Sequence, residues 1–532
     1  IYHMGREEKA DLILNRQAMA SHTFVTGSTG TGKSNAVYHL LDEITKDGRT
    51  SFLVVEPAKG EYKNVFGSRA DVKVFGTNPR ETPLLRINPF AFPQDIHILE
   101  HIDRLVEIFN ACWPMYAAMP AVLKDAIERS YQKAGWDLRN SESEKGVFPT
   151  FFDLLDILPG VIEESHYSKD TQSDYVGALC TRVKSLTNGI YGSVFCAEDA
   201  LSDAELFDCN VVVDLSRVGS METKSLLMGI LVMKLQEYRM CGSEMNSRLR
   251  HVTVLEEAHN LLRKTSAEQS QEGANLQGKS VEMLANAIAE MRTYGEGFII
   301  ADQAPGLLDM SVIRNTNTKI ILRLPDEEDR KLVGKSAGLK EAQIDELSKL
   351  PLGVAAVYQN EWPEAVLCKI EAYPMPEDAV YHKPSKMPHE INAEFVFGQL
   401  AAGKELEPLG ISEMEQLKLW LKRHEMMLKP EDGRYLEQVF AGGELDVAKT
   451  RKAVFDFFGG ISTVVDYCAA AEKSFTPRKE FLEQLQGQYG LKAAAADWVL
   501  NSVISMGMSL NPDAKAVDNL RTNFEQQGGR VL

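Results

Sequence analysis

Residues 27–34 have the sequence Gly-Ser-Thr-Gly-Thr-Gly-Lys-Ser, and this segment constrains the fold more than any other. It fits the pattern G-x-x-x-x-G-K-[ST], which requires a loop between a strand and a helix. Both flanks are present, because residues 23–26 form a short strand-like run and residues 34–45 carry apolar side chains at helical spacing. At average residue usage, chance would place the four fixed positions in a chain this long in roughly 2% of cases. The segment therefore predicts a phosphate-binding loop rather than a simple glycine-rich turn.

The residue types of this loop match the chemistry of a bound nucleotide. Glycines let successive backbone N–H groups converge on phosphate oxygens, and the following helix adds the positive end of its dipole. Lys33 would neutralise the β- and γ-phosphates, and the Ser34 hydroxyl would bind Mg²⁺. ATP and Mg²⁺ are thus the expected cofactors. The expected binding residues are Gly27, Ser28, Thr29, Gly30, Thr31, Gly32, Lys33 and Ser34.

Further strand-like runs follow the loop, and most of them are continuously apolar. A strand that is buried on both faces has this pattern, which is typical of parallel sheets covered by helices. Helical patterns over residues 222–240 and 281–294 alternate with these runs. We therefore expect an α/β fold with a mostly parallel sheet flanked by helices. Its further strands are expected at 51–55, 72–75, 211–213, 252–255, 298–301 and 319–322.

The chain has 532 residues, which is too long for one compact unit. Between about 95 and 205 the pattern becomes mostly helical, clearest at 98–112 and 121–133. We expect an all-α insertion at 95–205 that divides the core into parts 21–94 and 206–372. The second part ends with paired strand-like runs at 353–358 and 365–370. Pro374, Pro376, Pro384 and Pro388 then mark a linker to a helical carboxy-terminal domain, 373–532, with helices at 413–428, 445–458, 478–486 and 493–506.

Composition excludes several classes of protein. Apolar residues make up 44% and charged residues 25% of the chain, as in a globular protein that is soluble in water. The seven cysteines include no C-x-x-C pair, which argues against zinc sites and a disulfide framework. No apolar run of 18 residues and no signal peptide occur, so we expect a cytoplasmic protein without a membrane partner. The net charge of -18 repels nucleic acid from the outer surface and leaves a local basic pore as the place for it.

Two adjacent acidic residues, Glu256 and Glu257, follow the apolar run His251–Leu255. A phosphate loop binds nucleotide, but hydrolysis also needs an acid near the metal and a group that orients water. At the end of a strand in the same sheet, the first side chain can lie near Mg²⁺ and the second can reach the attacking water. The alternative is that these two acids simply end a strand and have no chemical role. A good phosphate loop in the same sheet makes this alternative less favoured. His259 is interpreted as a polar residue at a helix start.

Several motifs occur in one order and resemble the HerA-FtsK family of P-loop ATPases. They are residues 27–34, Leu255–Asn260 (LEEAHN), Arg292–Gly295 (RTYG) and Ala301–Gln303 (ADQ), supported by Glu56–Tyr62 (EPAKGEY), Asn88–Phe90 (NPF) and Asn315–Leu324 (NTNTKIILRL). The resemblance covers about residues 1–370. It implies a RecA-like core, a homohexameric ring that hydrolyses ATP at subunit interfaces, and double-stranded DNA in its central channel.

The resemblance also implies roles for single residues. Lys33 and Ser34 would bind nucleotide and Mg²⁺, Glu256 would be the acid on the metal side, and Glu257 would be the catalytic base. Gln303 would be the polar sensor after the next core strand. Arg292 lies in the motif whose arginine reaches the neighbouring subunit's γ-phosphate. The competing candidates for that role are Arg314, Arg323 and Arg330.

Two departures from the family pattern concern the amino terminus and the metal-side acid. The family carries an amino-terminal β-barrel before the phosphate loop, whereas only 26 residues precede it here and the first of them is Ile1. We interpret residues 1–20, with Met4-Gly5-Arg6, as the exit segment of a barrel missing from this numbering. Glu256 stands where the family more often has Asp, which keeps the charge on a longer side chain.

Two functions of different classes fit these observations. The first is an ATP-driven DNA translocase or helicase that resembles HerA and works with a nuclease in DNA processing or antiviral defence. The second is a regulatory or scaffold ATPase ring that assembles and switches an effector, such as a nuclease or a sirtuin-like NADase. The acidic net charge and the unassigned helical tail favour protein contacts and so support the second.

Overall fold

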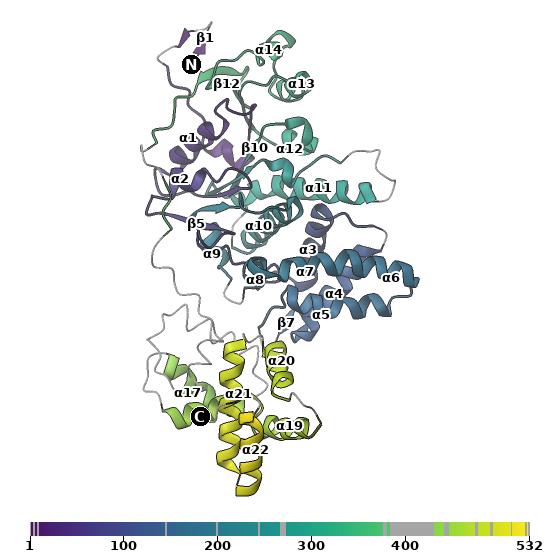
Figure 1. The fold of residues 1–532 in the computed structure, drawn as a ribbon. Coiled ribbons are helices and arrows are strands. Elements are labelled where there is room, and N and C mark those ends of the chain that lie inside the picture. Colours follow the sequence, from purple (N-terminus) through teal and green to yellow (C-terminus); the bar gives the residue numbers. More distant parts are fainter. Residues whose placement is uncertain are drawn as a thin grey trace. The chain divides into compact units, whose positions relative to one another are not determined.

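The computed structural model describes residues 2–3, 6–7, 10–116, 118–143, 146–197, 200–242, 245–265, 273–375, 380–383, 430–440, 446–473, 477–489, 493–511, 513–526 and 529. The chain divides into two compact units, Ile1–Lys383 and Pro384–Leu532. The first unit carries the motifs of the resemblance and is built on one large sheet (Figure 1).

This sheet has nine strands in the order β13-β12-β11-β3-β10-β9-β4-β8-β5. Every neighbouring pair from β11 to β5 is parallel, and the pairs β11–β12 and β12–β13 are antiparallel. The expected strands and the mostly parallel α/β fold are confirmed. The strands are β3 (Thr23–Thr26), β4 (Ser51–Glu56), β5 (Val72–Gly76), β8 (Asn210–Asp214), β9 (His251–Glu256), β10 (Glu296–Asp302), β11 (Thr318–Ile321), β12 (Val354–Gln359) and β13 (Val366–Lys369).

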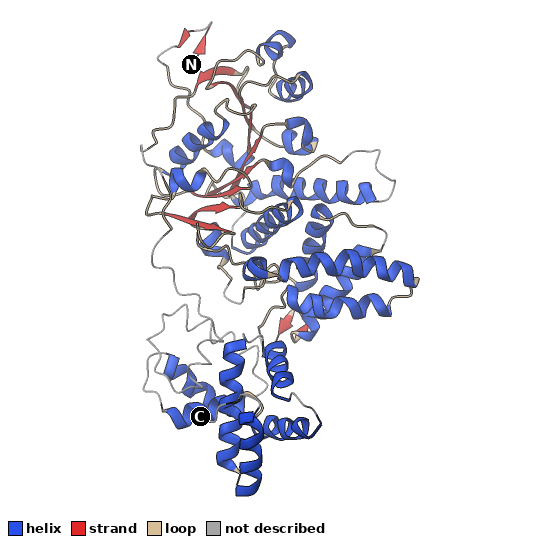
Figure 2. Cartoon of the chain, in the orientation of Figure 1, coloured by secondary structure: helices blue, strands red, loops and turns tan. Residues whose placement is uncertain are grey.

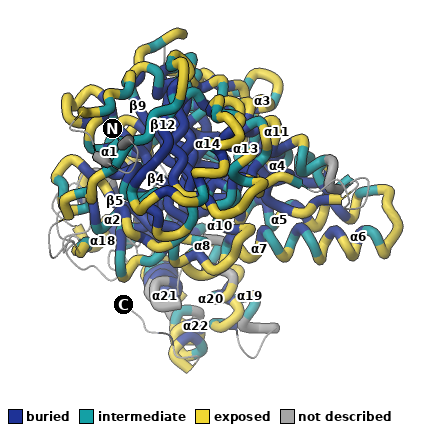
Figure 3. The backbone as a smooth tube through the Cα atoms, turned by 90° about the horizontal axis from the view of Figure 1, so that it is seen from above, coloured by how far each residue is buried: buried dark blue, intermediate teal, exposed yellow. Residues whose placement is uncertain are grey.

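Each face of the sheet has its own hydrophobic core, because successive side chains of a strand point to opposite faces. Phe24 and Leu53 belong to one cluster of buried residues, whereas Val25 and Phe52 belong to another. Strands with both faces covered must be apolar throughout, which explains the continuous runs in the sequence. Figure 2 shows helices on both sides of the strands, and Figure 3 shows the central strands as the buried part of the unit.

The two faces are covered by different helices. The core on one face includes side chains of α1 (Lys33–Thr45) and α2 (Tyr62–Phe66), among them Val37, Leu41 and Phe66. The core on the other face includes α3 (Ile98–Cys112), α10 (Met221–Gly242) and α11 (Gly273–Glu290), and α3 packs against both of the others. Three short helices complete the unit: α12 (Met310–Arg314), α13 (Glu327–Ser336) and α14 (Glu341–Glu346).

The segment between β5 and β8 is mostly helical. It connects two strands that are neighbours in the sheet. After α3 it contains α4 (Met119–Lys133), α5 (Phe151–Glu164), α6 (Lys169–Tyr175), a π-helical turn (Val176–Cys180), α7 (Thr181–Thr187), α8 (Gly189–Phe195) and α9 (Asp203–Phe207). The expectation of an all-α segment overlooked one hairpin of β6 (Trp136–Asp137) and β7 (Glu142–Ser143). Strands of two residues are too short to show a period of two. Near the amino terminus, β1 (Tyr2–His3) pairs with β2 (Arg6–Glu7), whereas Met4 and Gly5 lie outside the described residues.

The second unit is helical where it is described, with its own core that includes Leu436, Val454, Leu500 and Phe524. The prediction at 413–428 lies outside the described residues. Among described helices, none alone is long and apolar enough to span a membrane, although α18 and α19, bent by 66°, reach that length and composition together. The helices are α17 (Pro430–Phe440), α18 (Val447–Phe457), α19 (Gly460–Lys473), α20 (Pro477–Tyr489), α21 (Ala493–Leu510) and α22 (Ala514–Gln526).

Candidate active site

The phosphate loop connects the end of β3 to the start of α1, and its sequence dictates its tight shape. Gly32 has φ 104°, a left-handed conformation that side chains rarely adopt. A Cβ at Gly27 would lie 2.7 Å from the Cβ of Leu322, so a side chain there would collide with the residue directly after β11. The loop is closed by the Thr31 hydroxyl, which donates to the Ser28 carbonyl at 2.7 Å. The backbone N–H groups of the loop are thus held in one arrangement before any ligand arrives.

Three strand ends bring the predicted site residues together. Strands β3, β10 and β9 are neighbours and parallel, so the segments after them meet at one edge of the sheet. The Lys33 ammonium donates to Glu257 Oε1 at 3.3 Å, and the Thr29 hydroxyl donates to Gln303 Oε1 at 2.9 Å. These side chains border a cavity of about 420 Å³, which we call the phosphate-loop pocket. From the predicted set, the lining includes Ser28, Thr29, Gly30, Gly32, Lys33, Ser34, Glu257 and Gln303.

Glu257 has a strained backbone at this edge. Its φ of 45° and ψ of 52° are left-handed, which is uncommon for a residue with a side chain and is found at functional sites. Its Oε1 accepts from Lys33, whereas its buried Oε2 has no hydrogen-bond partner among the described residues. This buried oxygen lies 3.6 Å from His259 Nδ1, within ion-pair distance, while the carboxylate as a whole borders the pocket. This arrangement fits a group that orients water.

Glu256 is not brought to the pocket wall. It is the last residue of β9, 5% exposed, and its carboxylate accepts a hydrogen bond from the Tyr62 hydroxyl. Burial raises the pKa of Glu256, although the Lys33 charge partly counteracts this effect. The carboxylate is buried and is not among the groups that line the pocket. Its role as the acid on the metal side stays a prediction.

Lys59 also borders the phosphate-loop pocket, although sequence reasoning gave it no role. Its φ of 60° is left-handed, and the loop around it is fixed by Glu56, whose carboxylate accepts from the N–H groups of Glu61 and Tyr62 at 2.8 and 3.1 Å. Burial raises the pKa of Glu56 to about 8, although these two hydrogen bonds oppose the rise. The segment EPAKGEY was the signal that could have identified Lys59, since it carries a lysine in a glycine-containing turn after a strand.

A further wall of the pocket comes from a part of the chain more distant in sequence. Leu352, Gly353, Ile370 and Ala372 line this side. The Gly353 N–H donates to the Thr31 carbonyl at 3.2 Å, and the Ile370 N–H donates to the Gly353 carbonyl at 2.7 Å. The antiparallel pair β12–β13 thereby attaches its ends to the phosphate loop. No local pattern in the sequence could have indicated this wall.

Arg292 lies at the opposite edge of the sheet. It belongs to a short 3-10 helix, Met291–Tyr294, directly before β10, whereas Gln303 directly follows β10. At about 3.3 Å per residue, the strand separates the two by roughly 20 Å. Arg292 and Arg314 are exposed and line a second cavity of about 560 Å³, which we call the arginine pocket. It is also lined by Ser21, Asn286, Ala289, Glu290, Thr293, Asn315, Thr316, Asn317 and Asn360.

The structure separates the competing arginines. Arg323 follows β11, and its carbonyl accepts from the Ser28 N–H at 3.0 Å, so it belongs to the phosphate-loop edge. The Arg330 guanidinium donates to the carbonyls of Leu324 and Pro325 on the same side. Arg314 alone among the three competitors shares a pocket with Arg292.

Comparison with known proteins supports the family resemblance. Residues 3–234 match the family model of the helicase HerA central domain. This match and the curated relatives support a P-loop ATPase of the HerA-FtsK family. A HerA DNA double-strand break repair helicase of Sulfolobus acidocaldarius is 25% identical over 364 residues, covering 67% of this chain and 66% of the relative. A probable helicase of Methanocaldococcus jannaschii is 24% identical over 391 residues, covering 68% of each chain.

Solved structures agree with the fold of this chain. VirB4 of Thermoanaerobacter pseudethanolicus has a TM-score of 0.51 at 19% identity and covers 66% of this chain and 90% of its own. The conjugative coupling protein TrwB has a TM-score of 0.50 at 16% identity, with coverage of 69% and 90%. The chain spans about two thirds of the length of the curated HerA relatives it matches.

Proposed function

We propose that the chain is an ATP-hydrolysing ring motor that translocates on double-stranded DNA or unwinds it. The observation that carries the proposal is the phosphate-loop pocket, because Lys33, Glu257 and Gln303 all border this one cavity. The HerA relatives, which are named as DNA repair helicases, support the DNA part of the proposal.

The pocket residues divide the chemistry among them. Lys33 neutralises charge on the β- and γ-phosphates, while the loop N–H groups hold the phosphate oxygens. Glu257 accepts the proton of the attacking water through its carboxylate, and Gln303, held by Thr29, orients the γ-phosphate or the water. Ser34 at the start of α1 would hold Mg²⁺, and Glu256 would be the acid on the metal side. The metal would further neutralise the phosphate charge.

We infer that the ring is a homohexamer in which Arg292 acts on the nucleotide of the neighbouring subunit. Its position roughly 20 Å from its own Gln303 leaves it too far to serve its own phosphate-loop pocket. A pocket on one edge that needs a group from the other edge implies a head-to-tail contact, which closes into a ring or extends into a filament. DNA in the central channel and a nuclease or NADase effector in DNA processing or antiviral defence complete the proposal.

A second candidate is the scaffold ATPase ring, which assembles and switches an effector with little translocation. The net charge of -18 favours it, because such a surface repels DNA outside a channel. The separate helical core of the second unit also offers a place for a protein partner.

The test measures ATP turnover and solution mass with and without double-stranded DNA, in the absence of any partner. The motor is expected to be hexameric and stimulated by DNA, and Lys33→Ala should abolish turnover because the γ-phosphate loses its neutralising charge. Turnover that DNA leaves unchanged would favour the scaffold ring. A strictly monomeric protein with ATP and Mg²⁺ would contradict both candidates.

A further inference from the structure

One buried carboxylate joins the two strand ends that carry the chemical groups of the pocket. Asp302 is the last residue of β10 and is fully buried. Its Oδ2 accepts from the backbone N–H of His259 at 2.8 Å, and its Oδ1 accepts from the N–H of Ala304 at 2.9 Å. The segment after β9 and the segment after β10 are therefore attached to the same side chain.

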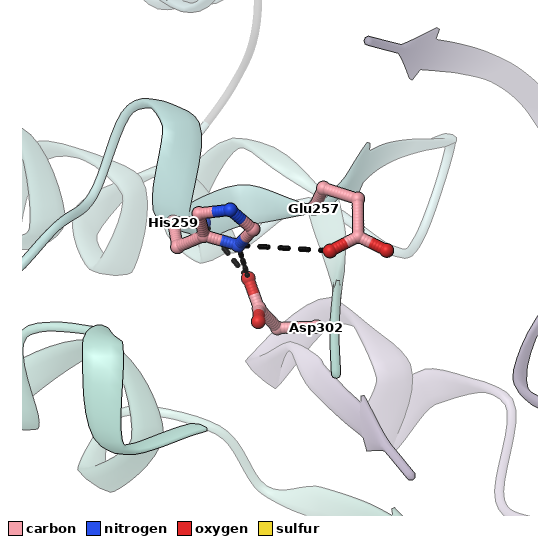
Figure 4. Close-up of side chains that lie close together, drawn as sticks. All are labelled: Glu257, His259 and Asp302. Carbon is pink, nitrogen blue, oxygen red and sulfur yellow. Dashed lines mark hydrogen bonds and ion pairs between the residues drawn. The ribbon is translucent and has the colours of Figure 1, made fainter. Parts of the chain in front are cut away.

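The ring of His259 makes a second contact with this carboxylate. Its Nδ1 lies 2.9 Å from Asp302 Oδ2 and 3.6 Å from Glu257 Oε2, so it stands between the two acids (Figure 4). The hydrogen bond to Asp302 raises the pKa of His259. With Nδ1–H as the donor, this hydrogen bond holds the ring beside Glu257.

The left-handed backbone of Glu257 needs such support. A residue in this region is strained and persists only where its surroundings impose that conformation. The Glu257 carbonyl accepts from the N–H and the side-chain amide of Asn260 at 2.9 and 2.7 Å, and His259 is attached to Asp302. Contacts of the next three residues thus fix the conformation of Glu257.

These contacts close a circuit around the pocket. Asp302 attaches to His259 and precedes Gln303; Gln303 accepts from Thr29, and Lys33 donates to Glu257. Moving the β9 end relative to the β10 end would therefore disturb both groups of the pocket at once. We propose that His259 and Asp302 are a positioning pair that holds Glu257 and Gln303 in register beside the phosphate loop. The proposal rests on the proposed ATP hydrolysis and assigns a positioning role within it.

Asp302→Asn and His259→Ala test the pair. A misplacement of about 1 Å costs about 10² in rate, so both variants should lose roughly 10- to 100-fold in kcat. Affinity for ATP should stay within about threefold of wild type, since neither residue borders the phosphate-loop pocket. His259→Asn should recover most of the rate, because its amide N–H takes the place of Nδ1. The matched control is His166→Ala, which changes an exposed histidine of the segment between β5 and β8 and should leave kcat unchanged.

Two kinds of outcome, kinetic and crystallographic, would overturn the pair. One is wild-type kcat in Asp302→Asn, or a His259→Asn variant as slow as His259→Ala. The other is independent of turnover: crystal structures of wild type and Asp302→Asn are expected to differ in the Glu257 carboxylate, with its 3.3 Å contact to Lys33 lost. An unmoved carboxylate contradicts the inference even if the protein hydrolyses no ATP. If the wild-type protein hydrolyses no ATP, the proposed function is contradicted. The crystallographic comparison alone then tests the positioning pair.

Discussion

The two polar pockets lie at opposite edges of the same strands and differ in how they are built. The phosphate-loop pocket lies at the carboxyl ends of β3, β10 and β9, where internal hydrogen bonds hold its lining in place. The arginine pocket lies at the amino ends of β3, β10 and β11, where Arg292 and Arg314 reach solvent. Among described residues, no arginine borders the first pocket and no lysine borders the second. Under the proposed function, the first edge would hold phosphate and the second would supply positive charge to a neighbouring copy of the chain.

The largest effect should come from Arg292→Ala, which tests whether the arginine pocket serves a neighbour. We expect ATP binding and assembly to persist while turnover falls by about 10³ to 10⁵, the contribution of a trans arginine. Phosphate release and nucleotide binding are measured separately. Mixed with Lys33→Ala subunits, the variant should regain some activity, because some interfaces then combine an intact phosphate loop with an intact arginine. Normal hydrolysis by Arg292→Ala would move the assignment to Arg314.

Glu257→Gln tests the phosphate-loop pocket, by removing the carboxylate that we propose as the base. Loss of the carboxylate removes the proton acceptor, so turnover should fall by about 10² to 10⁴ while ATP still binds and the ring persists. Radiolabelled ATP retention and phosphate release check the two halves of this prediction. A near wild-type rate would remove Glu257 from the role of base.

Lys59→Gln should have a smaller effect that is confined to one ligand. Lys59 adds positive charge at the pocket wall, so affinity for ATP should fall about tenfold and affinity for ADP should change less, since ADP lacks the terminal phosphate. Calorimetric titration with both nucleotides gives the ratio. Lys46→Gln, at an exposed position just after α1, is the control. Equal losses for both nucleotides would show that Lys59 does not distinguish the terminal phosphate.

The smallest effect concerns stability near the arginine pocket. Lys319 on β11 is 2% exposed and donates to the Thr316 carbonyl at 2.7 Å, and burial lowers its pKa to about 8. Between pH 8 and the ordinary lysine pKa of 10.5, the unfolded chain binds more protons, so stability should rise with pH. The wild-type free energy of unfolding should gain about 1–3 kcal/mol relative to Lys319→Met between pH 7 and 10. Chemical unfolding at several pH values measures this difference, and a constant difference would contradict it.

The sequence predicted those features that depend on position along the chain. The phosphate loop follows from its motif, and the parallel strands follow from continuous apolar runs. The family resemblance implied that Glu257 and Gln303 serve the same site. The contact between His259 and Asp302 could not be predicted, because it joins residues 43 apart through side-chain orientation. For the same reason, the position of a carboxylate at the end of β9 gave no sign that Glu256 turns toward Tyr62. The β12–β13 wall depends on pairing across more than 300 residues, for which neither segment carries a signature.

The helical segment between β5 and β8 has a consequence for how such proteins diverge. The chain leaves the sheet after β5 and re-enters it at the adjacent strand β8, so neither strand has to move when the connection changes length. α3 packs against α10 and α11, and α9 packs against α10, whereas α5 packs against α4 and α7. Lineages can lengthen, shorten or exchange these outer helices while the strand ends keep their places. Selection can therefore remodel this outer region for new partners at little risk to the hydrolytic machinery.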